Sequence, residues 1–133
     1  NQGKSYAIKM LHKRKIIELK QIDHIKNEKN ILASAYHPFI VNLAELLDEN
    51  NLYLVFDFVQ GGEIFRLLRK ETCFPNDVGL FYIAEITLAL QYLHNQQIAY
   101  RDLKPENLLI GNDGHIKITD FGFAKKIEDK SYT

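Results

Sequence analysis

The chain is poor in cysteine and carries no net charge, and each of these features excludes a class of protein. Cys73 is the only cysteine among 133 residues, so neither an internal disulfide nor a cysteine-rich metal site can form. A single cysteine also suits a reducing compartment. The 17 Lys and Arg residues balance the 17 Asp and Glu residues, so nothing in the charge points to nucleic acid or membrane as the main partner.

Long apolar runs, internal repeats and low-complexity segments are also absent. The longest apolar runs, such as residues 31–35 and 52–55, are far shorter than the ~20 residues that span a bilayer. The first residues show no signal-peptide pattern, and we expect none. With 46% hydrophobic and 26% charged residues, the composition is that of an ordinary globular protein, large enough for one hydrophobic core.

The first half of the sequence predicts a small antiparallel sheet and one helix. Residues 5–11 read as a strand, and residues 43–48 and 52–58 as an antiparallel pair joined by a short turn. Residues 22–34 are predicted to form a helix that stops before Pro38, because the residue before proline avoids the α region. The helix residues expected to pack inward are Ile22, Ile25 and Leu32.

The second half predicts helices and a small hairpin. After a Gly-Gly break, residues 63–70 read as a short helix. Residues 77–94 read as a long helix, apolar on most faces, which we expect to lie buried at the centre of this half. Two short strands, 108–110 and 116–118, flank a Gly-Asn-Asp-Gly turn, so the segments before and after this hairpin should meet at its open end.

Two motifs indicate a chemical activity. They are the run Arg101-Asp102-Leu103-Lys104-Pro105-Glu106-Asn107 and the later Asp120-Phe121-Gly122. In the Asp-x-x-x-x-Asn spacing, Asp102 can accept the proton of an attacking hydroxyl while Asn107 shares a magnesium ion with Asp120. Asp-Phe-Gly alone is a plausible loop tripeptide in any globular protein. Joined to the seven-residue run at this distance, it indicates phosphoryl transfer from ATP.

These motifs resemble those of the eukaryotic protein kinases, and the resemblance covers the whole chain. It implies an α+β, two-lobed protein-kinase-like fold with ATP and Mg2+ as cofactors. Tyr6-Ala7-Ile8-Lys9 is similar to the third strand of the kinase small lobe, whose Lys pairs with the ATP α- and β-phosphates. Glu28 matches the Glu that positions this Lys, although a Glu picked blindly would more often be a solvated helix charge.

The resemblance also assigns roles at the reacting centre. It implies that Asp102 orients and deprotonates the substrate hydroxyl, that Lys104 steadies the γ-phosphate, and that Asn107 and Asp120 hold magnesium. Lys9, positioned by Glu28, would neutralise the other phosphates. The chemistry implied is therefore mostly the placement of charge.

Further matching positions form the expected ATP site, with a hinge whose backbone groups bond the adenine edge at residues 57–59. The residues carried over to ATP binding are Ala7, Lys9, Glu28, Phe56, Asp57, Phe58, Val59, Glu63, Leu109 and Asp120. Ala7, Phe56 and Leu109 are the side chains that would enclose the adenine ring. For these three, plain core packing is an equally good interpretation.

Residues 104–107, Lys-Pro-Glu-Asn, are typical of Ser/Thr kinases rather than tyrosine kinases. Tyr100 stands where most kinase families have His, and together with residues 120–125 it resembles the cyclic-nucleotide-dependent branch of the AGC group. Regulation by cAMP and regulation by cGMP both stay open. The resemblance implies a cyclic-nucleotide-binding regulatory subunit or domain as a partner, and a cytoplasmic location that can include the nucleus.

Negative charge around the hinge predicts the substrate preference. Residues 43–65 hold five acidic residues and no Lys or Arg, so this segment should carry negative potential. Glu63 and Glu106 match the residues with which the branch binds substrate arginine. We therefore expect protein substrates with basic residues before the phosphorylated Ser or Thr, no nucleic-acid partner and no membrane span.

An activating phosphorylation site is expected at Thr133, thirteen residues after Asp120, which is the family's distance. His24, Arg101 and Lys125 match the family's three phosphate-binding positions. One phosphate could thus tie the catalytic loop, the segment after Asp-Phe-Gly and the first helix together. An arbitrary helix histidine is more often simply exposed, and this alternative stays open for His24.

The pattern departs from the family by truncation. An upstream Gly-rich loop and a downstream Ala-Pro-Glu are missing, so Asn1 and Thr133 are interpreted as cut points. The expected division is a small-lobe part at 1–56, a hinge at 57–62 and a large-lobe part at 63–133. We expect this fragment alone to be inactive, with an unpaired sheet edge that favours aggregation.

Two other functional classes stay open, a nucleotide-binding or scaffolding pseudokinase and a small-molecule phosphotransferase. The pseudokinase interpretation loses weight because the charged and amide residues of the pattern are all present, namely Lys9, Glu28, Asp102, Asn107 and Asp120. Small-molecule kinases do not usually carry Lys-Pro-Glu within the Asp-x-x-x-x-Asn spacing. Residues 104–106 therefore favour a protein substrate.

Overall fold

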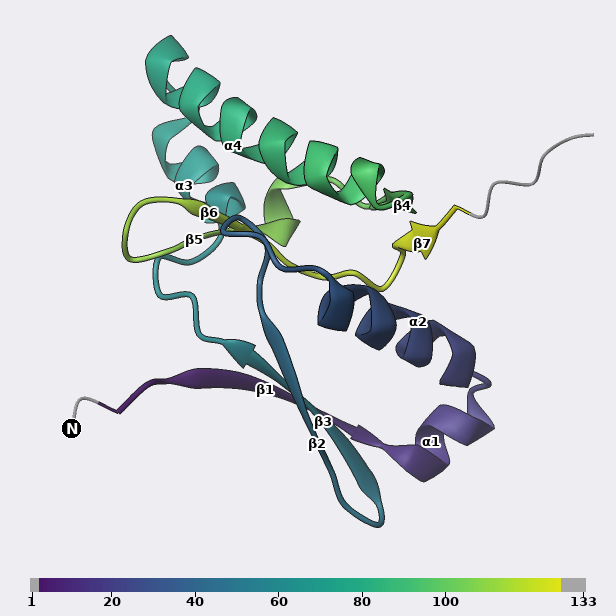
Figure 1. Ribbon diagram of the computed structural model, residues 1–133. Coiled ribbons are helices and arrows are strands. Elements are labelled where there is room, and N and C mark those ends of the chain that lie inside the picture. Colours follow the sequence, from purple (N-terminus) through teal and green to yellow (C-terminus); the bar gives the residue numbers. More distant parts are fainter. Residues whose placement is uncertain (1–2, 128–133) are drawn as a thin grey trace, which may run out of the picture.

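The computed structural model describes residues 3–127, without the side chains of residues 45–47. A three-stranded sheet with two helices forms one part, and two further helices with a short hairpin form the other (Figure 1). The elements are, in order, β1 (Tyr6–His12), α1 (Lys13–Glu18), α2 (Ile22–Ser34), β2 (Leu43–Leu47), β3 (Asn51–Asp57), α3 (Ile64–Glu71), α4 (Asn76–Asn95), β4 (Ile98–Ala99), the 3-10 turn η1 (Pro105–Asn107), β5 (Leu108–Ile110), β6 (Ile116–Ile118) and β7 (Lys125–Lys126). This arrangement confirms the predicted α+β architecture.

β3 is the central strand of the sheet, which has the order β1-β3-β2 and is antiparallel throughout. Its alternate residues Leu52 and Leu54 are buried, as expected for a strand with one face on a core. Asp48 fixes the turn before β3, because its Oδ1 accepts the backbone N–H groups of Asn50 and Asn51. Hydrogen bonds, those from Asn51 foremost, lower the pKa of Asp48 to about 2. The predicted antiparallel pair is confirmed.

One hydrophobic core joins the two parts of the molecule. Its buried residues are Ile31, Leu32, Ala35, Ile40, Val41, Ile64, Ala89, Leu93, Ile98, Tyr100, Leu108, Ile116, Ile118, Phe121 and Ala124. Ile118 and Phe121 have no solvent exposure and stand on either side of Asp120 in the sequence. The most deeply buried part of the core therefore sets the position of this carboxylate.

α2 has the predicted bounds, but its expected inward face is partly wrong. Leu32 is buried and Ile25 is half-buried, whereas Ile22 is exposed. Ile31, which the periodicity argument passed over, is buried instead. α2 packs against β2 and β7, and its buried residues all lie in its second half, so the first turn projects into solvent.

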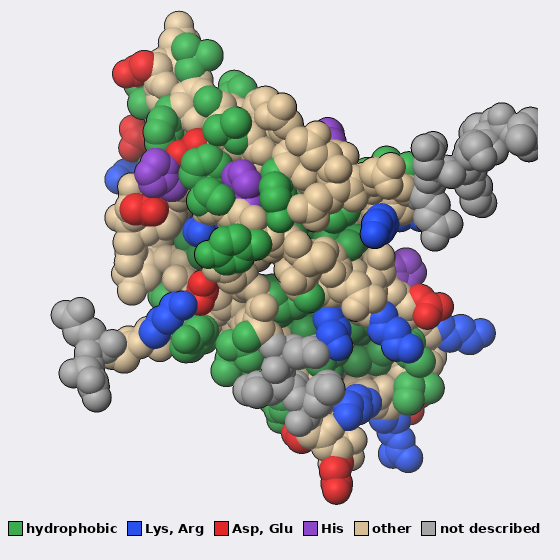
Figure 2. Space-filling view, viewed as in Figure 1, with side chains coloured by type: hydrophobic (Ala, Val, Ile, Leu, Met, Phe, Trp, Pro, Cys, Tyr) green, Lys and Arg blue, Asp and Glu red, His purple; other side chains and the backbone are tan. Residues whose placement is uncertain are grey.

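The prediction that the long helix α4 lies buried at the centre of its half is wrong for the described residues. Glu85, Ala89 and Leu93 are its buried residues, on the side that faces β4 and β6. Figure 2 shows hydrophobic side chains at the surface over α4. Leu80 and Ile83 are 67% and 61% exposed, because no described element covers that side of the helix.

Short elements that the sequence did not predict owe their existence to tertiary contacts. α1 continues β1 directly, and the pair β4–β7 brings together residues far apart in the chain, with Ala99 opposite Lys125. The N–H of Ile127 extends this pair by donating to the carbonyl of Gln97 at 2.7 Å. Among the described helices, none combines the length and hydrophobicity needed to cross a bilayer.

Two glycines connect the sheet to the hairpin β5–β6. The N–H of Gly61 donates to the carbonyl of Ile110 at 2.8 Å, and the N–H of Ile110 donates to the carbonyl of Gly62 at 2.9 Å. Gly62 has a φ of 77°, which favours glycine. A Cβ at Gly61 would lie 2.3 Å from the Ile110 carbonyl oxygen, so the close approach of the two backbones requires glycine there.

We expect Gly61→Ala to lower the free energy of unfolding by ~1–3 kcal/mol, because the added methyl group forces the paired backbones apart. Urea unfolding of the full-length protein measures this change. Gly79→Ala on α4 is the matched control, since a Cβ there meets nothing within 4 Å. That variant should gain ~0.5–1 kcal/mol from helix propensity. Equal effects of the two substitutions would contradict this account of the connection.

Candidate active site

Tyr100 anchors the loop that carries the catalytic motif. It is buried, its hydroxyl donates to the carbonyl of Thr119 at 2.6 Å, and its ring lies edge-on to Phe121 with centroids 5.0 Å apart. Burial raises its pKa, and the charges of Asp120 and Asp102 add to this effect. The sequence had marked Tyr100 as unusual without assigning it a task. In the structure it fixes the catalytic loop to the segment before Asp-Phe-Gly.

Asp102, Lys104 and Asn107 form one polar network. The Nδ2 of Asn107 donates to the backbone carbonyl of Asp102 at 2.9 Å and to its Oδ2 at 2.8 Å. The Nζ of Lys104 lies 3.4 Å from the other carboxylate oxygen, Oδ1. Asp102 is thus oriented through both oxygens, and its side chain keeps 18% exposure toward solvent. A fixed, accessible carboxylate of this kind can receive a proton from a hydroxyl group.

The segment that precedes Asp120 meets this network at the open end of the hairpin β5–β6, as predicted. The N–H of Thr119 donates to the carbonyl of Asn107 at 3.0 Å, which joins the two ends of the hairpin. Asp120 has a φ of 59° and Arg101 a φ of 64°, in the left-handed region. Gly122 donates its N–H to the Oδ1 of Asp120 at 3.3 Å. Such strained residues cluster at functional sites, where the surrounding structure holds them in place.

The donor set of Asn107 and Asp120 suits a magnesium ion. Nδ2 of Asn107 is directed at Asp102, which turns its amide oxygen the other way. A carboxylate and an amide oxygen are hard ligands, and Mg2+ typically takes one or two protein ligands and completes its shell with water and substrate phosphates. Among residues 3–127, no group of three or more His, Cys, Asp and Glu residues is arranged to hold a metal. The site thus fits magnesium together with a nucleotide rather than a self-sufficient metal cage.

Lys9 and Glu28 form the predicted ion pair between β1 and α2. Nζ of Lys9 lies 3.8 Å from Oε2 of Glu28, whose side chain is 8% exposed against 51% for Lys9. Burial raises the pKa of Glu28, Lys9 opposes this shift, and the charge of Asp120 adds to it. The backbone N–H of Phe121 also bonds this carboxylate and lowers its pKa. Glu28 therefore links Lys9 to the Asp-Phe-Gly segment.

The expected adenine site comes from both parts of the molecule. Ala7 pairs with Phe56 across β1 and β3, whereas Leu109 lies on β5 and forms an isolated bridge with Glu63. Ala7 is exposed, so core packing does not account for it, while Phe56 packs against the core.

The expected hinge residues lie between these two parts. The carboxylate of Asp57 is occupied by Lys4 at 2.8 Å and by Asn42 at 3.1 Å, which lowers its pKa. Phe58 is 52% exposed, and its N–H donates to the Ser5 carbonyl at 3.3 Å. Val59, in the same connection, is half-buried. The side chain of Asp57 is thus engaged in holding β1, which leaves backbone groups of the connection as the candidates for adenine recognition.

His24, Arg101 and Lys125 line one hollow of about 320 Å3, together with Asn27 and Gly122 and their neighbours. Arg101 is tied to the wall by its Nε, which donates to the Phe123 carbonyl at 2.8 Å. The three side chains that the resemblance assigned to one phosphate are therefore brought together. Thr133, the predicted phosphorylation site, lies outside the described residues.

Glu63 and Glu106 stand on neighbouring elements, because α3 packs against η1. Glu106 is exposed, and Glu63 is 38% exposed at the start of α3 with its carboxylate 3.9 Å from Nε of Arg66. A salt bridge this long and this exposed is weak. Both carboxylates are therefore accessible to an external cation.

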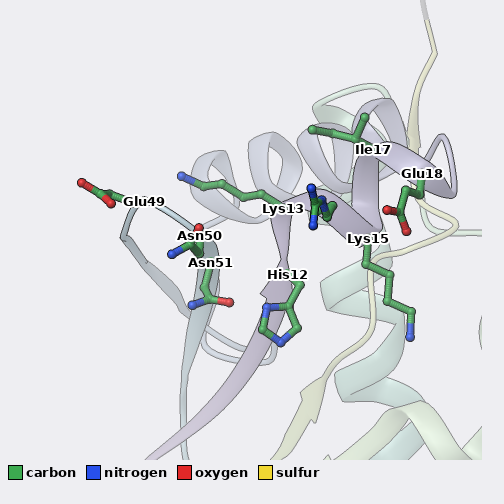
Figure 3. Close-up of a pocket in the computed structure, with 9 residues that line it drawn as sticks. His12, Lys13, Lys15, Ile17, Glu18, Glu49, Asn50 and Asn51 are labelled. Atoms are coloured by element: carbon green, nitrogen blue, oxygen red, sulfur yellow. The ribbon is translucent and has the colours of Figure 1, made fainter.

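A wide hollow of about 1100 Å3 lies away from all these residues. It opens between α1 and the turn before β3, where Figure 3 shows Lys13 extending toward Asn50 and Glu49. Lys13, Arg14 and Lys15 line this hollow, and Figure 2 shows basic side chains gathered in the region of α1 and α2. Nζ of Lys13 already donates to the Asp48 carbonyl. The hollow is a wide surface depression, and its volume does not make it the active site.

Comparisons with known proteins agree with this geometry. A family model described as protein kinase domain matches residues 1–133. The cAMP-dependent protein kinase catalytic subunit of Dictyostelium discoideum is 58% identical over 132 residues, which are 98% of this chain and 20% of that protein. The cAMP-dependent protein kinase catalytic subunit 3 of Drosophila melanogaster is 56% identical over 128 residues, 96% of this chain and 22% of that protein.

A third relative is cAMP-dependent protein kinase type 3 of Saccharomyces cerevisiae. It is 50% identical over 134 residues, which cover 100% of this chain and 34% of that protein. The chain thus spans between a fifth and about a third of the length of these three relatives.

We expect Glu28→Gln to keep or raise the free energy of unfolding at pH 7. The folded state raises the pKa of Glu28, so its ionisation costs stability as the pH rises from the ordinary carboxyl value through the higher folded value. Gln keeps the shape and removes the charge. Urea unfolding measures the effect, with Glu18→Gln on exposed α1 as a control that should change nothing. If the free energy of unfolding falls clearly in Glu28→Gln but not in Glu18→Gln, the inference that the buried, ionised Glu28 costs stability is contradicted.

Proposed function

Because this chain belongs to the protein kinase family, we propose that the full-length protein transfers the γ-phosphate of Mg-ATP to Ser or Thr residues of protein substrates. The observation that carries this proposal is the network in which Asp102 is held by Lys104 and Asn107. The charges of these residues suit phosphoryl transfer, and Asp120 follows Thr119, whose N–H is bonded to Asn107.

In the proposed reaction, the substrate hydroxyl oxygen bonds to the γ-phosphorus while the bond from that phosphorus to the β,γ-bridging oxygen breaks. Asp102 orients the hydroxyl and accepts its proton, and Lys104 stabilises negative charge on the transferring group. Asn107 and Asp120 would hold magnesium, which supplies positive charge to the phosphates. Lys9, oriented by Glu28, would bind the α- and β-phosphates.

Substrate choice and regulation are the finer parts of the proposal. Glu63 and Glu106, accessible and on packed elements, would bind basic residues ahead of the phosphorylated Ser or Thr. Two of the relatives are named as catalytic subunits of cAMP-dependent protein kinases, which supports a cyclic-nucleotide-binding regulatory subunit or domain as partner. The same proposal includes the division into a small-lobe part, a hinge at 57–62 and a large-lobe part. It also includes a cytoplasmic or nuclear location.

Asp102→Ala in the full-length protein should reduce the rate of phosphoryl transfer on the order of 10²-fold or more, because it removes the group that orients the nucleophile. Initial rates with Mg-ATP and a Ser peptide carrying upstream Arg measure this loss. Asp77→Ala, an exposed residue in the first turn of α4, is the matched control and should keep its rate. A near-normal rate in Asp102→Ala would refute the assigned mechanism, and a wild-type protein that binds ATP without transferring phosphate would establish the pseudokinase alternative.

Phosphorylation of Thr133 should raise activity through the hollow lined by His24, Arg101 and Lys125. A phosphate carries about −1.5 to −2 charges and is bound well by Arg. We expect phosphatase treatment to lower the wild-type rate ~10-fold or more, and Arg101→Ala to make the rate indifferent to that treatment. Lys126→Ala, next to Lys125 in the chain but not on this hollow, should keep the wild-type response. Full activity of Thr133→Ala would argue against this device.

A further inference from the structure

A buried carboxylate on α4 takes no part in the proposed phosphoryl transfer. Glu85 is 5% exposed, and the other buried residues of its helix, Ala89 and Leu93, are apolar. Burying an ionised carboxylate is costly unless its oxygens have partners. The partners of Glu85 therefore indicate what it does.

Both oxygens of Glu85 bind the beginning of β6. Oε1 pairs with Nδ1 of His115, and Oε2 accepts the backbone N–H of Ile116 at 2.9 Å. Ile116 is fully buried, so water does not compete for the second bond. One side chain of α4 thus holds two consecutive residues of the hairpin.

The held residues close the hairpin whose open end carries the site. The carbonyl of His115 accepts the N–H of Gly111 at 2.8 Å and completes the turn between β5 and β6. At the other end, Asn107 precedes β5 and Asp120 follows β6 after one residue. Three residue pairs join the strands. At ~3.4 Å per residue, the two ends are therefore only ~10 Å apart.

The His115 ring also joins α4 to the loop after α2. It stacks on Phe39 with centroids 5.8 Å apart and planes at 27°, and its centroid lies 5.7 Å from that of Phe81 on α4. The carbonyl of Phe39 accepts the N–H of Ile118 at 2.8 Å, so the same loop is bonded to β6. An imidazolium ion over an aromatic ring gains cation–π attraction that the neutral ring lacks. The charge on His115 therefore strengthens contacts among three elements.

We propose that Glu85 and His115 are positioning residues, which brace the hairpin β5–β6 between α4 and the loop after α2 and hold it more firmly when His115 is protonated. This inference rests on the proposed function, because the brace matters through the placement of Asn107 and Asp120. Neutral His115 can still share a hydrogen bond with Glu85 through Nδ1, but it loses the charge–charge attraction.

The surrounding charges set the direction of the pH dependence. The hydrogen bond with Glu85 raises the pKa of His115, the charges of Glu85 and Asp113 add to this, and burial and Lys117 oppose it. The loop after α2 contributes His37, whose pKa is lowered by burial and by Lys117. Because the folded pKa of His115 is raised, its stabilisation is complete below the ordinary value of ~6.5 and is lost as the pH rises through the folded value.

The first test measures a structural effect and does not depend on enzyme activity. In the full-length protein with labelled histidine and backbone nitrogen, NMR across the pH range gives the pKa of His115 and the amide shifts of Asn107 and Asp120. We expect a His115 pKa above ~6.5, amides that titrate with the same midpoint, and a lower His115 pKa in Glu85→Gln. If the amide shifts of Asn107 and Asp120 do not change as His115 titrates, the proposed brace is wrong.

The second test follows the reaction. Glu85→Gln and His115→Phe, which keeps an aromatic ring on Phe39, should lower kcat about 3–10-fold near pH 6.5, with KM for peptide nearly unchanged and a flatter pH profile. His94→Gln, an exposed histidine on the same helix, is the control and should keep the wild-type profile. If His115→Phe and Glu85→Gln both keep that profile, the brace does not position the site.

The two proposals fail in different ways. A wild-type protein without phosphoryl transfer at any pH would refute the proposed function, and the NMR titration would still decide whether the brace exists. Circular dichroism identifies a variant that does not fold, and His115→Phe then carries the test in place of Glu85→Gln.

Discussion

The whole site depends on the pairing of β6 along both of its edges. β5 lies on one edge, and the loop after α2 lies on the other, through backbone bonds of Ile118 to Phe39 at 2.8 Å and to Val41 at 3.0 Å. Both inward residues of this three-residue strand are fully buried. A slip of one residue would turn them outward, so the register is strongly specified. Because Asp120 follows β6 after one residue, the carboxylate inherits this precision, and Asn107 shares it across the hairpin.

Local signals in the sequence were enough for the parts that this pairing joins. α2 could be predicted because thirteen residues of helical periodicity end just before a proline. β5–β6 could be predicted because the strands Leu-Leu-Ile and Ile-Lys-Ile flank a Gly-Asn-Asp-Gly turn. The spacing of Asp102, Asn107 and Asp120 in the sequence was enough to predict that these polar residues act together. These features depend on residues close together in the chain, where propensity and turn chemistry act directly.

The remaining features depend on which distant elements come together, and periodicity does not carry that information. α4 is apolar on most faces, yet Leu80 and Ile83 stay exposed because packing covers only one side of the helix. The tasks of Tyr100 and Glu85 were not foreseen, since their partners Thr119 and His115 lie 19 and 30 residues away. For Tyr100, the replacement of a more usual histidine was the one available signal. A glutamate on an otherwise apolar helix face was the corresponding signal for Glu85.

The left-handed backbone at Arg101 and Asp120 has a consequence for the evolution of this chain. Each conformation strains a residue with a side chain, and glycine at such a position relieves the strain in the folded state. Substitutions that ease the fold at these two points would therefore remove the arginine and the carboxylate to which we assign phosphate and magnesium binding. On the proposed function, selection for thermal stability alone would enrich molecules that fold better and catalyse less.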